Sequence, residues 1–99
     1  MVFMYESKVN LIFASKNKSV ALGLFYDRTS VITPAVVAKA TGDEAAELLE
    51  GGKQQGVYIL YDDIAYDLVW NNNVGKPLHK EDFRIVASAY AKMYDEEEE

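Results

Sequence analysis

Histidine, cysteine and activated serine are common catalytic side chains, and the chain contains one histidine, His79, and no cysteine. A general base needs an orienting partner and a substrate proton within reach, so an enzyme would require a cleft that joins His79 to a carboxylate. His79 instead follows Leu78 and precedes Glu81 and Asp82, an arrangement typical of a helix N-terminus. No serine lies in a nucleophile-elbow motif. We therefore predict that His79 is a structural helix cap, that no residue is catalytic and that the chain is not an enzyme.

Two further patterns match ligand sites only in part. Gly51-Gly52-Lys53 lacks the spaced first glycine and the hydroxyl residue after the lysine that a phosphate-binding loop requires. Asp62, Asp63 and Asp67 offer hard oxygen ligands, but their spacing matches no calcium-binding loop. The absence of cysteine also excludes thiolate metal sites. The sequence therefore predicts no metal and no cofactor.

The segment from Pro34 to Gly51 has apolar, small and turn residues at the spacing of a helix-turn-helix motif. Its second half would be the recognition helix, and it carries four carboxylates with no base before Lys53. Phosphate affinity comes from lysine and arginine, so these carboxylates would be repelled from a DNA groove. We predict no direct binding of nucleic acid.

Acids and tyrosines are concentrated in the middle of the chain. The net charge is −6, and residues 41–70 hold seven acids against one base, Lys53, while residues 1–40 and 71–94 are both net positive. Such a run is either a solvated face or a contact surface. Tyrosine is enriched at protein interfaces, although in alternating strands half of these tyrosines would lie in the core. The predicted partner-binding residues are Asp43, Glu44, Glu47, Glu50, Tyr58, Tyr61, Asp62, Asp63, Tyr66 and Asp67.

This surface predicts a small non-enzymatic binding protein or inhibitor that docks on a protein partner, such as a phage or mobile-element modulator of host machinery. The alternative is an acidic nucleic-acid mimic that occupies the basic groove of a DNA- or RNA-binding protein. Binding by a mimic would weaken steeply as salt rises, whereas a tyrosine-anchored interface would depend less on salt.

The expected location is the cytoplasm. The chain has no apolar run long enough to span a bilayer and no basic leader typical of a signal peptide. The lack of cysteine fits a reducing compartment.

Hydrophobic periodicity predicts the elements that position these residues. Residues from Val9 to Tyr26 alternate as a β-hairpin with a turn at residues 15–18, and Gly23 indicates a bulge or close approach. Thr33-Pro34 predicts a helix through Ala40. Gly42 would end this helix, and a second one would then run from Thr41 or Asp43 to Glu50 and stop at Gly51-Gly52. A single helix kinked at Gly42 is the alternative.

The second half of the chain predicts another hairpin and a final helix. Val57–Tyr61 reads as a strand, and Asp62-Asp63 as a turn into a strand at Ile64–Trp70, with a short helix as the alternative for that last segment. The final helix has an apolar stripe of Phe83, Val86, Ala87, Tyr90 and Met93, and a hydrophobic staple from Leu78 to Phe83.

The predicted fold class is therefore α+β, with elements in the order ββα(α)ββα. An antiparallel sheet of two hairpins would carry its helices on one face. Residues 1–94 would form a single domain, and the acidic residues 95–99 would be a disordered tail.

Overall fold

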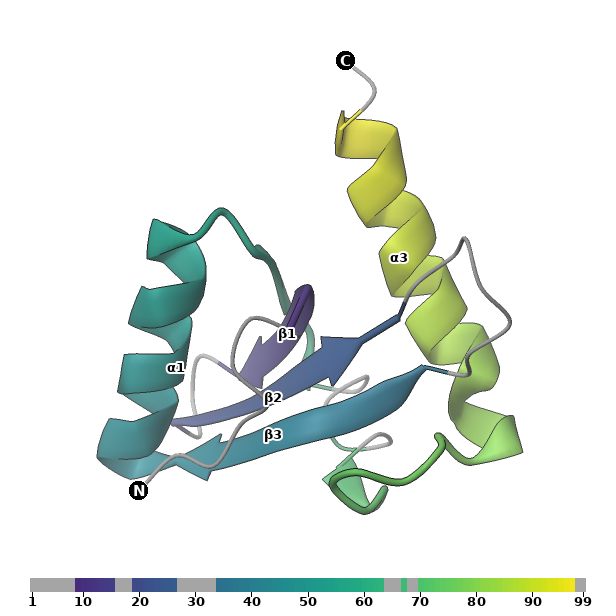
Figure 1. The fold of residues 1–99 in the computed structure, drawn as a ribbon, viewed down its shortest axis with the longest axis horizontal. Helices are drawn as coiled ribbons and strands as arrows, with labels where there is room; N and C mark the ends of the chain where they lie inside the picture. The colour runs from purple at the N-terminus through teal and green to yellow at the C-terminus, as the bar shows by residue number, and fades with distance from the viewer. Residues whose placement is uncertain (1–8, 16–18, 27–33, 64–66, 68–69, 98–99) are drawn as a thin grey trace.

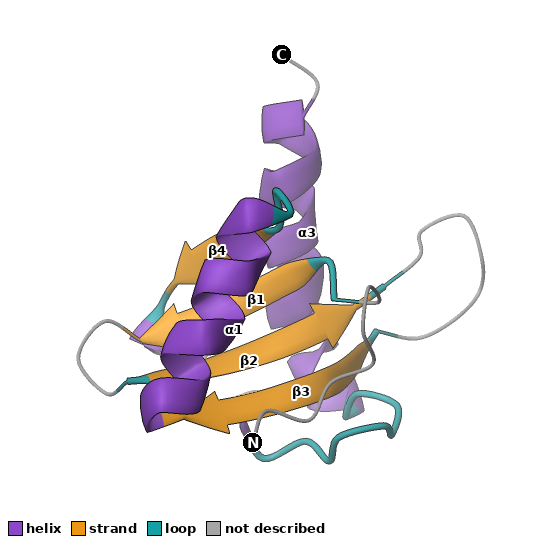
Figure 2. Ribbon diagram, turned by 60° about the vertical axis from the view of Figure 1, so that its left-hand side comes forward, coloured by secondary structure: helices purple, strands orange, loops and turns teal. Residues whose placement is uncertain are grey.

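A four-stranded sheet lies between two helices in the computed structural model of the chain (Figures 1 and 2), which describes residues 9–15, 19–26, 34–63, 67 and 70–97. This arrangement confirms the predicted α+β class. In chain order the elements are β1 (Leu11–Ser15), β2 (Val20–Phe25), β3 (Ala35–Thr41), α1 (Gly42–Gln54), β4 (Tyr58–Tyr61), the 3-10 helix η2 (Lys80–Asp82) and α3 (Phe83–Glu97).

The strands lie in the order β3-β2-β1-β4, so β3 and β4 form the two edges of the sheet. The predicted first hairpin is confirmed, because β1 and β2 pair antiparallel with Leu11 opposite Leu24. The irregularity predicted at Gly23 is also confirmed, since the register between β2 and β3 shifts between Gly23 and Leu24. A Cβ at Gly23 would lie 3.0 Å from a methyl group of Val9, so glycine permits this close approach.

The helix predicted to begin at Thr33-Pro34 is wrong: residues from Ala35 to Thr41 form the edge strand β3. Val36, Val37 and Ala38 are all buried, because both faces of the sheet are covered. A strand covered on both faces reads as a continuous apolar run without alternation, which periodicity does not distinguish from a helix. The two β-branched valines favoured the strand.

The second predicted helix is confirmed as α1, with Thr41 at its N-cap position but without a side-chain cap hydrogen bond. Gly42 does not end a helix; it has a φ of 59°, a left-handed conformation that favours glycine, at the corner between β3 and α1. Gly51-Gly52 does not stop α1 either, and the helix continues to Gln54. A Cβ at Gly52 would lie 2.6 Å from the δ-methyl of Ile12, so this glycine lets α1 pack closely on the sheet.

The helices cover both faces of the sheet, which corrects the prediction that they share one face. Figure 2 shows α1 in front of the strands and α3 behind them. On the α1 side the buried core is rich in small residues: Val9, Ile12, Ala21, Val37, Ala38, Ala40, Ala45 and Leu48. On the α3 side it holds larger ones: Leu11, Phe13, Leu22, Leu24, Val36, Leu78, Val86, Ala89, Tyr90 and Met93.

The strand predicted after Gly56 is confirmed as β4, but it pairs in parallel with β1 and forms no hairpin there. The sheet is therefore mixed, because β1, β2 and β3 pair antiparallel. The strand predicted over Ile64–Trp70 falls largely outside the described residues. Of its described positions, Asp67 and Trp70 have helical backbone.

The predicted final helix is confirmed as α3, and Val86, Tyr90 and Met93 of its stripe are buried. Two other residues of the predicted apolar stripe are not buried. Phe83 is 37% exposed and Ala87 is also exposed, so the predicted staple to Leu78 does not bury Phe83. Ala89 takes the place of Ala87 in the core.

The helix α3 continues to Glu97 and therefore includes residues 95–97 of the segment predicted as a disordered tail. The contribution of this segment to stability stays a prediction. Within the described part of the chain, no helix is both long and apolar enough to cross a membrane.

Candidate functional site

The acids predicted to bind a partner lie on two elements. Asp43, Glu47 and Glu50 are exposed on α1, and Glu44 on the same helix is half-buried. The other three acids follow β4: Asp62 is half-buried, whereas Asp63 and Asp67 are exposed. Their role in binding stays a prediction.

The three predicted tyrosines have different environments. Tyr58 in β4 is half-buried and packs against the core on the α3 side, so much of its surface has a structural role. Tyr61, at the end of β4, is 42% exposed. Tyr66 lies outside the described residues.

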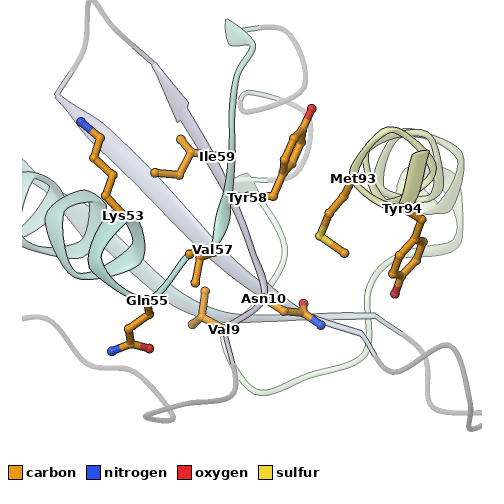
Figure 3. A pocket seen from close by; sticks show the side chains of 10 residues that line it. Val9, Asn10, Lys53, Gln55, Val57, Tyr58, Ile59, Met93 and Tyr94 are labelled. Carbon is orange, nitrogen blue, oxygen red and sulfur yellow. The ribbon is translucent and has the colours of Figure 1, made fainter. Parts of the chain in front are cut away.

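A groove of about 750 Å³ opens beside the first half of β4 (Figure 3). Lys53 and Gln55 border it at the end of α1, Val9 and Asn10 at the start of β1, and Met93 and Tyr94 at the end of α3. Residues 56–59 lie along its length. Its volume falls within the range typical of ligand pockets.

The groove straddles the edge of the sheet because successive side chains of a strand point to opposite faces. Tyr58 packs with the α3-side core, whereas Val57 and Ile59 pack with the α1-side core. Figure 3 shows Ile59 and Val57 on the side of Lys53, and Tyr58 on the side of Met93 and Tyr94. An occupant of the groove would therefore contact both layers of the protein.

A polar cluster fixes the wall of the groove at Asn10. The Asn10 side-chain amide donates to the carbonyl oxygen of Tyr26 at 2.8 Å, and the Tyr90 hydroxyl donates to Asn10 Oδ1 at 2.6 Å. Burial, and then the neighbouring phenols of Tyr94 and Tyr26, raise the pKa of Tyr90 above its usual range. Because these hydrogen bonds join Asn10, Tyr26 and Tyr90, the cluster is a structural tie between the segments around β1, β2 and α3.

A second polar cluster was not recognised from the sequence. Asn72 is fully buried; its amide donates to Asp82 Oδ2 at 2.7 Å, and its Oδ1 accepts from the backbone N–H of His79 at 2.6 Å. His79 does occupy the N-cap position of η2, but without a side-chain cap bond, which corrects its predicted mode of action. The sequence predicted only that a strand ends at the three asparagines 71–73. No local pattern distinguishes the buried Asn72 from its two neighbours.

The segment held by Asn72 covers the β3 edge of the sheet. Gly75 donates its N–H to the carbonyl of Val36 at 2.9 Å, and Leu78 donates to the carbonyl of Pro34 at 3.0 Å. Pro77 forms an isolated bridge with Ala35. This cover is at the start of β3, where it satisfies the outward-facing carbonyl of Val36.

No cluster of three or more potential metal-ligating side chains occurs among the residues that the structure describes.

Away from the groove, the Lys39 ammonium lies 4.8 Å from the centre of the Trp70 ring, and burial lowers the pKa of Lys39. The groove offers apolar contact, aromatic surface and one cation.

No protein-family model matches the chain, and no curated protein matches it in sequence. Solved structures do resemble its fold. The C-terminal domain of EscU carrying a proline-to-alanine mutation has a TM-score of 0.72 at 19% identity, over 83% of this chain and 81% of that one. A second EscU C-terminal domain, with an asparagine-to-aspartate mutation, has a TM-score of 0.72 at 20% identity, over 82% and 74%. The cytoplasmic domain of FlhB from Shewanella putrefaciens has a TM-score of 0.77 at 18% identity, over 88% and 69%.

These similarities overturn the predicted function. Neither a phage-type inhibitor docking through an acidic, tyrosine-rich surface nor a nucleic-acid mimic fits neighbours that are domains of secretion-apparatus proteins. The prediction failed because an acidic block describes only surface charge, and the fold that carries it has no signature motif in this sequence. At this level of identity the comparisons show the fold alone.

Proposed function

We propose that this chain is a non-enzymatic protein-binding domain that serves a secretion export apparatus in the cytoplasm. The observation that carries the proposal is the fold shared with the EscU and FlhB domains over more than four-fifths of the chain. EscU and FlhB are components of type III secretion export apparatus, and such components interact with other proteins. The groove beside β4 supplies a surface of the right kind, since it is concave, lined by both polar and apolar side chains and bordered by tyrosine.

We further propose that the chain does not cleave itself. The EscU and FlhB cytoplasmic domains undergo autocleavage, and the EscU domains were studied with mutations of an asparagine and of the proline that follows it. The two prolines of this chain, Pro34 and Pro77, follow Thr33 and Lys76, so its 99 residues contain no asparagine-proline pair. The lack of this pair in the 99 residues supports a chain that does not cleave itself there.

Co-purification tests the cellular role. The full chain, tagged and expressed in the organism that encodes it, is purified at moderate salt beside an untagged control, and partners are identified by mass spectrometry. We expect enrichment of export-apparatus components or of proteins exported by it. Enrichment of nucleic-acid-binding proteins alone, or of no protein above the control, would contradict the proposal.

Intact-mass measurement tests the absence of cleavage. After prolonged incubation the purified chain should remain a single species of 11.1 kDa. Two complementary fragments that accumulate without added protease would show that the chain cleaves itself by another route.

A further inference from the structure

We infer that the β4 edge binds an extended peptide segment of a partner, which adds to the sheet as a fifth strand inside the groove between α1 and α3. The inference rests on the proposed protein-binding function and specifies its mode: main-chain hydrogen bonds to an edge strand, with alternate side chains in the flanking layers.

The backbone of Ile59 is oriented for this addition. Asp62 donates its N–H to the carbonyl of Ala14 in β1 at 3.2 Å, so the backbone of Asp62 faces β1. In a parallel pair, alternate residues turn both backbone groups to the same neighbour. Tyr58 and Leu60 therefore face β1, and Ile59 faces outward. Among the described residues, no backbone group outside the β1–β4 ladder bonds to Ile59.

The space beside that edge suits a strand. A strand added next to β4 would lie about 4.8 Å from it and would overlap the groove along residues 57–59. Its side chains would point alternately toward the two helices. One set would meet Val57 and Ile59 on the α1 side, and the other would meet Tyr58 and Met93 on the α3 side. Each face of the bound segment would therefore meet apolar side chains of one layer.

The charged side chains near the two ends of β4 favour one chain direction of the bound peptide. Lys53, which is exposed, is the one charged side chain among the described residues that line the groove, and it lies beside the start of β4. At the other end, β4 is followed directly by Asp62 and Asp63. An acidic residue of the peptide would be favoured near Lys53 and a basic residue near the aspartates. For antiparallel addition, the more stable pairing, the basic residue comes first in the peptide and the acidic residue last.

Two synthetic peptides of identical composition test this polarity. Each has a central run of valine and threonine and about eight residues in total, which span about 26 Å when extended. One carries lysine at its amino end and glutamate at its carboxyl end, and the other carries them in reverse. Titration into the isotope-labelled full chain, followed by amide resonances and hydrogen exchange, should shift and protect the Ile59 amide, with tighter binding of the lysine-first peptide.

A charge reversal at Lys53 provides the specificity control. Lys53→Glu should weaken the lysine-first peptide about fivefold and favour the reversed one, since exposed ion pairs contribute modestly. Lys76→Glu makes the same charge change beside the covered β3 edge, at another exposed position, and should leave both affinities unchanged.

The inference is overturned if neither peptide shifts Ile59, or if both bind equally and are insensitive to Lys53→Glu. It is also overturned if Ile59 is already protected in a concentration-dependent dimer, because a second copy would then occupy the edge. These failures differ from failure of the proposed function. Export proteins that co-purify while neither peptide binds would refute strand addition only, and peptide binding without such partners would refute the cellular role only.

Discussion

The two edges of the sheet differ in how the outward-facing backbone groups are hydrogen-bonded. Beside β3, Gly75 donates a hydrogen bond to Val36 of the strand and Leu78 donates one to Pro34 just before it. The segment that carries Gly75 and Leu78 is anchored by the buried Asn72. Beside β4, the described residues provide one such bond, from the Val57 N–H just before the strand to the Gly52 carbonyl of α1, and a groove lies along residues 56–59. An uncovered edge is a template for another chain. Among the described residues, a later segment thus covers the start of β3, whereas the outward backbone of Ile59 in β4 has no such cover, and we propose that it serves for recognition.

The largest expected effect removes the anchor of the covered edge. Asn72→Ala should destabilise the chain by about 3 kcal/mol, because the buried Asp82 carboxylate and the His79 N–H both lose a partner. Chemical denaturation measures this loss, and hydrogen exchange should show faster opening at Gly75 and Leu78 than at β4. The exposed neighbour provides a control: Asn71→Ala should change stability by less than about 0.5 kcal/mol. Equal effects of the two substitutions would refute the anchor.

A smaller effect is expected at the wall of the open groove. Tyr90→Phe removes the hydrogen bond to Asn10 and should cost about 1 kcal/mol. The raised pKa of Tyr90 adds a pH dependence. Above about pH 10 the phenol ionises in the unfolded chain but stays neutral in the folded one, so stability falls as pH rises, by up to about 1.4 kcal/mol per unit. Denaturation of both proteins at pH 8 to 11 should show a shallower alkaline decline in the variant. Parallel declines would contradict this role.

Two adjacent glycines test how closely α1 packs on the sheet beside the groove. Gly51→Ala should raise stability by roughly 0.7 kcal/mol, since its Cβ would meet open space and alanine favours a helix. Gly52→Ala should gain less or lose stability, because its Cβ would lie 2.6 Å from the δ-methyl of Ile12. Melting temperatures of the two variants provide the comparison. If both variants gain equally, the sheet tolerates a wider separation from α1 than we infer.

The smallest effect concerns the acidic face of α1. The double variant Glu47→Lys, Glu50→Lys should change stability by less than about 0.5 kcal/mol, because both side chains are exposed. Its affinity for peptides at the β4 edge should also change little. If the double variant loses as much peptide affinity as Lys53→Glu does, the acidic face of α1 is part of the binding site.

Elements with a clear local pattern were predictable from the sequence. The first hairpin alternates, α3 has an apolar stripe, and Gly23 interrupts a strand, so each was found. The edge strand β3 was missed because helix-start residues precede a strand whose buried faces hide its alternation.

The pairing of the strands depends on contacts that no local pattern encodes. Nothing in the Val57–Tyr61 run specifies that it joins β1 in parallel, because such pairing requires the intervening crossover helix to pack across the sheet.

For the candidate site, the sequence predicted some of the contact residues but not their arrangement. Tyr58 and Tyr61 were named as contact residues and do lie on the edge strand. The groove itself combines residues from β1, α1, β4 and α3, and Val9, Met93 and Tyr94 carry no signal of their shared position. Its recognition required the topology, in particular the two helices on opposite faces that leave the β4 edge between them.

Site-specific photo-crosslinking in cells tests the difference between the edges most directly. A photoreactive residue is placed at Tyr61 on the β4 edge, at Pro77 on the covered β3 edge, or at Glu47 on α1, three positions that are all exposed. We expect crosslinks to export-apparatus components or their exported proteins from Tyr61, and none from Pro77 or Glu47. Crosslinks to those proteins from Pro77 or Glu47, with none from Tyr61, would contradict it.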